Sequence, residues 1–324
     1  MQATQTLEKR PINTEKLRDF KPVDYLQHRK DCHEERTAST LSFNVTTNSG
    51  SESSYVDNSS YMDFDDRETF SSRVRKMVTI FPYRDPIYLV AVVFALGSLD
   101  LVINGFFDLL PRLSPETAFE TEETIAVPST VLIGSILFFA AGIFDTFGAL
   151  NADRGTLETS KEDLGAVTYK PALLGTPEFK WIPSRTKFLE LASTNLAFQA
   201  GLLVLFGGII FMFAGIVDFP GVIPEESPFF KLIVFGPQII HGVIFLVANA
   251  MLAFSEQERW FKPKVADPDW QGAFLNSVGG LGFMLAGVFL FARWEESAAV
   301  AELAGSVAFL IGSLVRWYVV MEFS

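Results

Sequence analysis

A few polar and ionisable side chains inside long apolar runs are the residues of this chain that could do chemistry. Asp100, Asn104 and Asp108 recur at four-residue intervals, which places them on one face of a helix. His241 lies near the middle of a different apolar run. A carboxylate that faces an imidazole across a helix bundle relays protons or coordinates a cation, because both groups titrate or bind ligands near neutral pH. Asp100, Asn104 and His241 therefore form a candidate intramembrane polar site.

Two further polar residues, Gln238 and Asn249, belong to the same run as His241, and the Gly236-Pro237 pair before them predicts a kink. The alternative for Asp100 is purely structural, with its carboxyl protonated or hydrogen-bonded to Asn104 or to a neighbouring helix. The sequence leaves both hypotheses open.

The elements that must hold these residues are six long apolar segments. Each has about 20 residues or more, the length that crosses a hydrocarbon core of roughly 30 Å, and each is almost free of Lys and Arg. Their apolar residues go all round the helix instead of forming one stripe, which excludes the helices of a soluble bundle. The sequence therefore predicts an all-α polytopic membrane protein with spans at Pro86–Leu110, Val127–Asn151, Thr194–Phe219, Phe229–Phe254, Gln271–Ala292 and Ala298–Val320.

One spacing, Gly-x7-Gly-x2-Asp, occurs in three of these segments, and a fourth segment keeps only its glycines. Repetition inside apolar runs predicts three repeated helical hairpins, which pair the first helix with the second, the third with the fourth and the fifth with the sixth. The matching positions are Gly97, Gly105 and Asp108; Gly134, Gly142 and Asp145; Gly207, Gly215 and Asp218; and Gly279 and Gly287 with Leu290 in place of the acid. The three acids are interpreted as markers of helix ends.

Small residues on these helices are predicted to be packing positions, because they let two backbones approach closely in lipid. In the last helix they form a stripe at four-residue intervals. The predicted packing residues are Gly134, Gly142, Gly207, Gly208, Gly215, Gly279, Gly282, Ala304, Ala308 and Gly312.

The chain divides into three parts. Residues 1–66 are polar and rich in Ser, Thr and Asn, so we expect a disordered tail. Residues 67–85 mix basic and apolar side chains and predict an amphipathic segment on the membrane surface. Residues 86–324 form the six-helix domain.

Loop charges predict the orientation. Basic and acidic loops alternate along the chain, so both termini should face the cytoplasm, although the organelle is not specified. The net charge is −12, and no basic stripe for nucleic acid is present.

Known catalytic patterns are missing from the sequence, so we expect a protein that is not an enzyme and needs no cofactor or metal. The cluster of His28, Cys32 and His33 has metal-binding residue types, but it lacks the paired spacing of a zinc site. It is interpreted as part of the polar tail.

Two short motifs resemble those of a known family. The first has two parts in the first span, Phe94-Ala-Leu-Gly-Ser98 and Ile103-Asn-Gly-Phe-Phe-Asp-Leu-Leu-Pro111. The second is Phe309-Leu-Ile-Gly-Ser-Leu314 in the last span. Both are similar to motifs of the YrhK-like integral membrane proteins of bacteria and fungi. The resemblance covers the helical region, implies a small-residue-rich membrane hairpin, and assigns no activity and no site residues.

The leading interpretation is a non-enzymatic multi-pass membrane protein with a structural or assembly role. The alternative is a proton- or cation-coupled transporter or channel for small solutes that uses Asp100, Asn104 and His241. A lipid-modifying membrane enzyme is the weakest hypothesis, because no nucleophile–base pair is visible. The expected partner is the lipid bilayer, and a homo-oligomer or a membrane partner is left open.

Overall fold

The structure is a computed structural model, and it describes residues 70–152, 154, 156–159, 167–170, 172–224 and 226–321. The predicted tail, 1–66, and its His28, Cys32 and His33 lie outside the described residues.

Six helices of the described chain are long and apolar enough to cross a membrane, which confirms the predicted fold class of a multi-pass, all-α membrane protein. Large apolar side chains are exposed along the outward side of each, as lipid-facing helices require. The helices are α3 (Pro86–Leu113), α4 (Val127–Asn151), α6 (Leu196–Val217), α7 (Phe230–Ser255), α8 (Pro268–Phe291) and α9 (Glu295–Val320).

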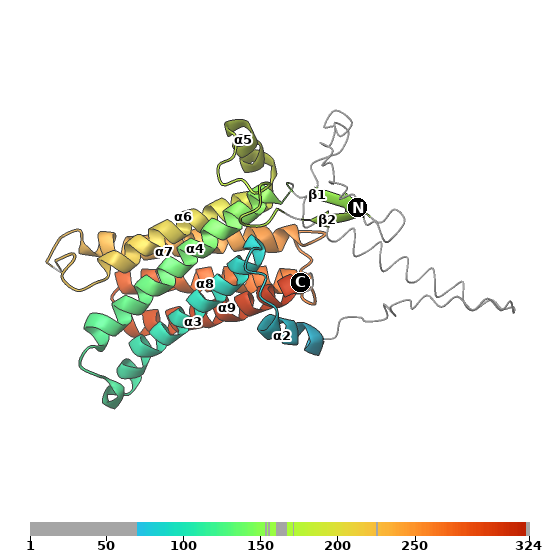
Figure 1. Ribbon diagram of the computed structural model, residues 1–324. Coiled ribbons are helices and arrows are strands. Elements are labelled where there is room, and N and C mark those ends of the chain that lie inside the picture. Colours follow the sequence, from blue (N-terminus) through green and yellow to red (C-terminus); the bar gives the residue numbers. More distant parts are fainter. Residues whose placement is uncertain are drawn as a thin grey trace, which may run out of the picture. The chain divides into compact units, whose positions relative to one another are not determined.

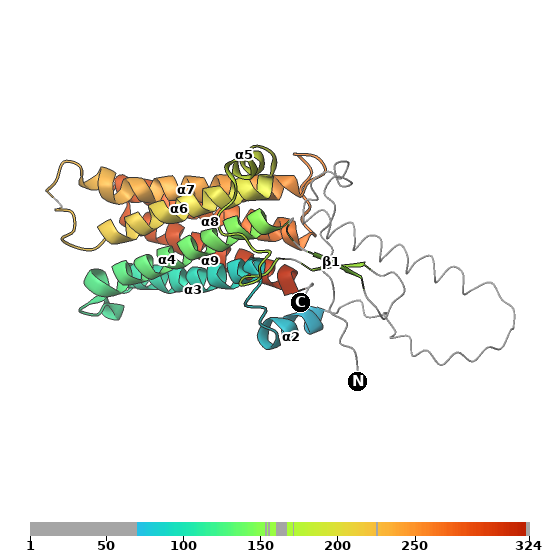
Figure 2. The ribbon, with the colours of Figure 1, turned by 45° about the horizontal axis from the view of Figure 1, so that its top comes forward.

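The six helices form a closed ring. Each packs against the next one along the chain, and α9 returns to pack against α3 (Figures 1 and 2). In this order α3 lies opposite α7, and α6 lies opposite α9. The short connections from α3 to α4, from α6 to α7 and from α8 to α9 all lie at the same end of the ring.

Local signals explain where the helices begin. Asp85 caps α3 by accepting a hydrogen bond from the Ile87 amide, and Asp267 caps α8 in the same way. Asn195 ends α5 (Arg185–Thr194) and caps α6 through a 2.8 Å bond from the Phe198 amide to its Oδ1. One asparagine thus separates a short helix from a spanning one, a division that the sequence analysis did not predict.

The smaller elements are α2 (Phe70–Thr79), η1 (Pro115–Thr117) and η2 (Glu122–Ala126), with an antiparallel hairpin of β1 (Thr156–Thr159) and β2 (Val167–Lys170). Helix α2 lies inside the segment for which an amphipathic element was predicted, and Arg73 lies 4.7 Å from the ring centre of Tyr318 on α9. The β-hairpin was not predicted, because polar, Thr-rich stretches of four residues give too weak a period for detection.

A layer of six phenylalanines fills the ring at mid-height, and each spanning helix contributes one of them. Every member is at most 5% exposed. Neighbouring rings stack or meet edge to face, with centroids 4.2 Å apart for Phe94 and Phe138 and 5.7 Å apart for Phe211 and Phe283. The six-Phe layer consists of Phe94, Phe138, Phe211, Phe245, Phe283 and Phe309.

Within each hairpin a glycine of the first helix receives the layer phenylalanine of the second. A Cβ atom on Gly97 would lie 2.9 Å from the Phe138 ring, and one on Gly207 would lie 2.8 Å from the Phe245 ring. On Gly279 it would lie 2.5 Å from the Phe309 ring. Any larger residue would push these rings away, so the glycines position the layer.

The other predicted packing glycines also face a neighbouring helix. Gly208 and Gly142 meet backbone across the α4–α6 contact, and Gly282 meets the backbone of Gly305 on α9. The remaining members of this group are Gly134 against Leu101, Gly215 against Leu132 and Gly312 against Asn276.

The prediction that the small-residue stripe of α9 packs against a neighbouring helix is correct only in part. Ala308 and Gly312 are buried, whereas Ala304 is exposed. A four-residue step turns a helix by about 40° more than a full circle, so a stripe of this kind rotates away from a straight contact. Ala304 lies at the end that has turned toward the outside.

Candidate functional site

A cavity of about 820 Å³ occupies one end of the ring. All six spanning helices contribute to its lining, from the halves near the short connections. Phe211 and Phe283 of the six-Phe layer belong to its lining, so the layer forms its base. The cavity is thus a polar pocket that stops at an aromatic floor.

His241 lies at this base and is 2% exposed. Its ring stacks on Phe211 with centroids 4.0 Å apart, and its Nδ1 lies 3.2 Å from the Pro237 carbonyl oxygen one turn earlier. A carbonyl only accepts, so Nδ1 carries the hydrogen and Nε2 of the neutral ring is an acceptor. Within the described part of the chain, Nε2 has no hydrogen-bond partner.

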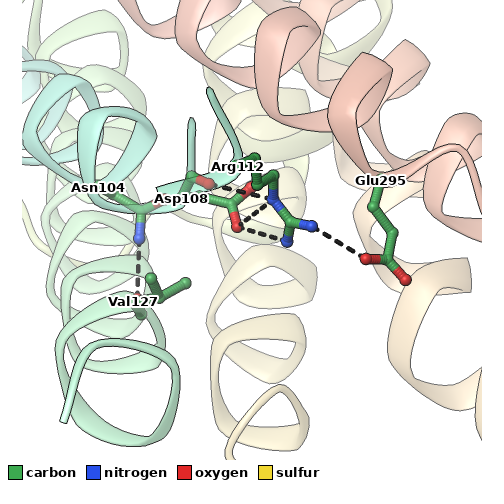
Figure 3. Close-up of polar contacts among 5 residues, drawn as sticks. All are labelled: Asn104, Asp108, Arg112, Val127 and Glu295. Carbon is green, nitrogen blue, oxygen red and sulfur yellow. Dashed lines mark hydrogen bonds and ion pairs between the residues drawn. The ribbon is translucent and has the colours of Figure 1, made fainter. Parts of the chain in front are cut away.

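Asn104 of α3 lines the opposite side of the cavity. Its Nδ2 donates to the Val127 carbonyl of α4 at 2.8 Å (Figure 3). The same Nδ2 donates to the Thr130 hydroxyl of α4 at 2.7 Å. These two bonds fix the orientation of the amide group. Its Oδ1 atom is buried and has no hydrogen-bond partner among the described residues. Two residues of opposite helices that line the same cavity, Asn104 and His241, therefore each carry a buried acceptor without a partner among the described residues.

The open end of the cavity carries an ion-pair network centred on Arg112. Its Nη2 donates to Asp108 Oδ1 at 2.8 Å, one turn earlier on α3. Its Nη1 donates to Glu295 Oε2 at 2.9 Å, which links α3 to the start of α9 (Figure 3). Arg112 therefore pairs with two carboxylates and links two helices of the ring.

Two other carboxylates of the cavity, Asp218 and Glu302, have no hydrogen bond or ion pair within the described part of the chain. Burial, and next the charge of Asp108, raises the pKa of Asp218 to about 6. Glu302 interacts at longer range with Asp108, Asp218 and Arg112. Two carboxyl groups without an ion-pair partner among the described residues therefore lie on opposite sides of the ring, at the end of α6 and on α9.

The structure brings together only part of the predicted polar site. Asn104, Gln238 and His241 line the cavity. Asp100 lies instead beside α4, where a Cβ atom added to Gly134 would be 3.1 Å from Asp100 Oδ2. Asn249 is outside the cavity lining as well, and its side-chain amide donates to the Phe245 carbonyl at 2.9 Å. Asp100 and His241 thus do not share the cavity, because the four-residue rotation that brings Asn104 and Asp108 inward turns Asp100 toward α4.

Glu302 and Lys231 line the cavity although the sequence did not predict them as site residues, and Asp218, interpreted from the sequence as a marker of a helix end, lines it too. A detectable signal was present for Glu302, an acid within the apolar part of α9. Lys231 lies in the first turn of α7, and its ammonium donates to the Phe291 carbonyl at 2.9 Å and lies 5.6 Å from the centre of the Phe291 ring.

The opposite end of the ring has an ion pair of its own. Arg316 Nη2 of α9 lies 2.6 Å from Asp145 Oδ1 of α4, and both side chains are largely buried. These two helices flank α3, so the pair joins the neighbours of α3 at the end away from the cavity.

Among the described residues, no group of three or more His, Cys, Asp and Glu side chains is placed to hold a metal ion. No family model, curated protein or solved structure matches this chain.

Proposed function

We propose that this protein moves a small solute across a membrane along the axis of its helix ring, and that it does so without catalysing a reaction. The observation that carries the proposal is a polar cavity that enters the ring from one end and stops at the six-Phe layer. A helix bundle with only a structural role fills its interior with packed side chains. An interior of about 820 Å³ with charged walls has instead the size of a ligand site.

In this proposal the six-Phe layer is the constriction. Aromatic side chains that close a pore exclude water and ions, and passage requires the rings to move apart. Since each helix carries one ring of the layer, a small rotation of a helix changes the opening. The ion pairs Arg112–Glu295 and Asp145–Arg316 hold α9 near the two ends of the ring, on either side of the layer.

We further place the cavity on the non-cytoplasmic side, with both termini in the cytoplasm. The support is the charge of the loops, because the connections at the cavity end are acidic. The three hairpins are proposed to be copies of one ancestral unit, supported by the glycine–phenylalanine pair that each contains. The similarity to YrhK-like proteins remains part of this proposal and adds no activity to it.

The proposal is tested by filling the cavity. The full-length protein is reconstituted in liposomes, and uptake of labelled methylammonium, acetate, urea and glycerol is compared with empty liposomes. Leu290→Trp places an indole in the cavity lining, whereas Leu281→Trp adds it to an exposed position on the same helix. We expect uptake of at least one probe, lost in Leu290→Trp and kept in Leu281→Trp.

Uptake no faster than in empty liposomes for all four probes would contradict translocation and favour the structural or assembly role. Equal uptake in the two tryptophan variants would show that the solute does not pass through this cavity. Thermal unfolding in detergent checks that each variant is folded.

A further inference from the structure

Most polar groups of the cavity that have no partner among the described residues are hydrogen-bond acceptors or carboxyl groups; the exceptions are Gln238, whose amide also carries donors, and the exposed Arg293. Asp218 and Glu302 supply free carboxylates from α6 and α9, which lie opposite each other in the ring. Asn104 Oδ1 and His241 Nε2 supply neutral acceptors from α3 and α7, the other opposite pair. A ligand that satisfies these atoms must bring donors and positive charge.

The orientation of the His241 ring supports the presence of a hydrogen-bond acceptor at the base of the cavity. Nδ1 faces the Pro237 carbonyl on its own helix, so Nε2, on the other side of the ring, points away from the α7 backbone. The imidazole ring itself is packed in the interior, where its face stacks on Phe211 with centroids 4.0 Å apart and Phe283 lies with its centroid 5.6 Å away. Both Nε2 and Asn104 Oδ1 are shielded from solvent, so neighbouring side chains must shift before a ligand reaches either atom.

The cationic side chains of the cavity are already engaged or lie near its rim. Arg112 is bound to Asp108 and Glu295. Lys231 is an example of an ammonium group held in the cavity lining. Its Nζ donates to the Phe291 carbonyl and lies 5.6 Å from the centre of the Phe291 ring. Phe235 and Phe283 also belong to the lining.

We infer that the cavity binds a small ammonium-type cation, with Asp218 and Glu302 as its counter-charges and Asn104 Oδ1 and His241 Nε2 as hydrogen-bond acceptors. The inference rests on the proposed translocation function and names its substrate class. The aromatic lining fits an ammonium that carries carbon substituents, because its alkyl part then contacts the rings while its N–H groups face the acceptors.

Equilibrium binding of labelled methylammonium to the full-length protein in lipid nanodiscs tests this inference. Labelled acetate serves as an anion of similar size. We expect saturable binding of methylammonium but not of acetate. Glu302→Gln should weaken methylammonium binding about tenfold or more, because the counter-charge is lost and the amide oxygen that remains is a weaker, neutral acceptor. The matched control is Glu296→Gln, on the same helix at an exposed position outside the cavity lining.

Asp218→Asn provides a second variant if Glu302→Gln does not fold, and it should also weaken binding about tenfold. Preference for acetate, equal binding to Glu302→Gln, Asp218→Asn and wild type, or displacement of methylammonium by K⁺ at equal concentration would overturn the inference. The two proposals fail separately. A protein that transports acetate but binds no methylammonium keeps the translocation function without this substrate class, whereas one that binds methylammonium but transports no probe loses the translocation function.

Discussion

His241 of α7 stacks face to face on Phe211 of α6, with ring centroids 4.0 Å apart and an interplanar angle of 10°. Phe211 belongs to the six-Phe layer and both residues line the cavity, so this pair joins the candidate binding site to the proposed constriction. A ligand that draws His241 Nε2 toward itself must also disturb the packing of Phe211. The contact is therefore the shortest physical connection between binding and opening in this structure.

Replacing His241 tests that connection. His241→Phe keeps an aromatic ring on Phe211 but removes the nitrogen acceptor, and His241→Ala removes both. We expect His241→Phe to stay folded and lose solute uptake, and His241→Ala to lower thermal stability as well, by about 2–4 kcal/mol for a buried ring. Uptake at the wild-type rate in His241→Phe would show that Nε2 has no part in transport.

Asp100 is expected to be dispensable for transport, because it lies beside Gly134 instead of in the cavity lining. Asp100→Asn keeps the shape of the side chain and removes a charge that is costly inside a membrane. Its thermal stability should be unchanged or slightly higher, and its uptake should equal that of wild type. Loss of uptake in Asp100→Asn with the fold intact would restore the original Asp100–His241 hypothesis.

Close helix packing predicts that a single added methyl group is harmful at Gly208. A Cβ there would lie 2.7 Å from the Phe139 Cα atom, so backbone has to move, at a cost of about 1–3 kcal/mol. At Gly148 the nearest atom would be 3.6 Å away, an ordinary contact. Gly208→Ala should therefore unfold in detergent at a lower temperature than wild type, and Gly148→Ala should not. Equal unfolding temperatures for the two variants would contradict the packing of α4 on α6.

The pKa of Asp218 predicts a specific pH dependence. Burial and the Asp108 charge raise it from 3.8 to about 6, so the folded protein binds more protons than the unfolded chain between these pH values. Stability should fall as pH rises through this window, and Asp218→Asn should remove that part of the fall. The other charged or titratable groups of the cavity are Asp108, Arg112, Glu123, Lys231, His241, Arg293, Glu295 and Glu302.

Thermal unfolding of wild type and Asp218→Asn at pH 4.5 and pH 7 provides the measurement. The expected result is a smaller loss of stability on going to pH 7 in the variant. Identical losses would mean that the Asp218 carboxyl has its ordinary pKa and is well hydrated in the folded protein.

The predicted orientation is tested with reporters. One fused after Ser324 should be cytoplasmic, and one inserted at exposed Glu120, in the connection between α3 and α4, should be outside. Reporters on the same side would contradict the alternation of basic and acidic loops.

The sequence was sufficient for the six spans and for most packing glycines, because both follow from composition and small size. It was insufficient to predict whether a polar residue of a spanning helix faces the cavity or a neighbouring helix. In a helix that is apolar all round, no stripe marks the inner face, so Asp100 and Glu302 could not be ranked from the sequence. The tertiary packing determines which of the two residues faces the cavity. Because α9 packs on α3 to close the ring, Glu302 is turned toward the cavity and Asp100 lies beside α4.

The ion pairs were missed for a related reason. Asp145 and Arg316 are far apart in the chain and lie on helices that are not consecutive, so no local spacing joins them. The acids of the repeated spacing, interpreted as markers of helix ends, have different environments. Asp108 and Asp145 are ion-paired, whereas Asp218 has no such partner within the described residues.

The most direct test of solute passage through the ring is the uptake rate after one phenylalanine of the six-Phe layer is removed. Phe245 is completely buried in the layer, whereas Phe254 on the same helix is 55% exposed. If the layer closes the path, Phe245→Ala in liposomes should admit small solutes faster than wild type, and Phe254→Ala should not. Wild-type uptake rates in a folded Phe245→Ala protein would contradict a path along the ring axis.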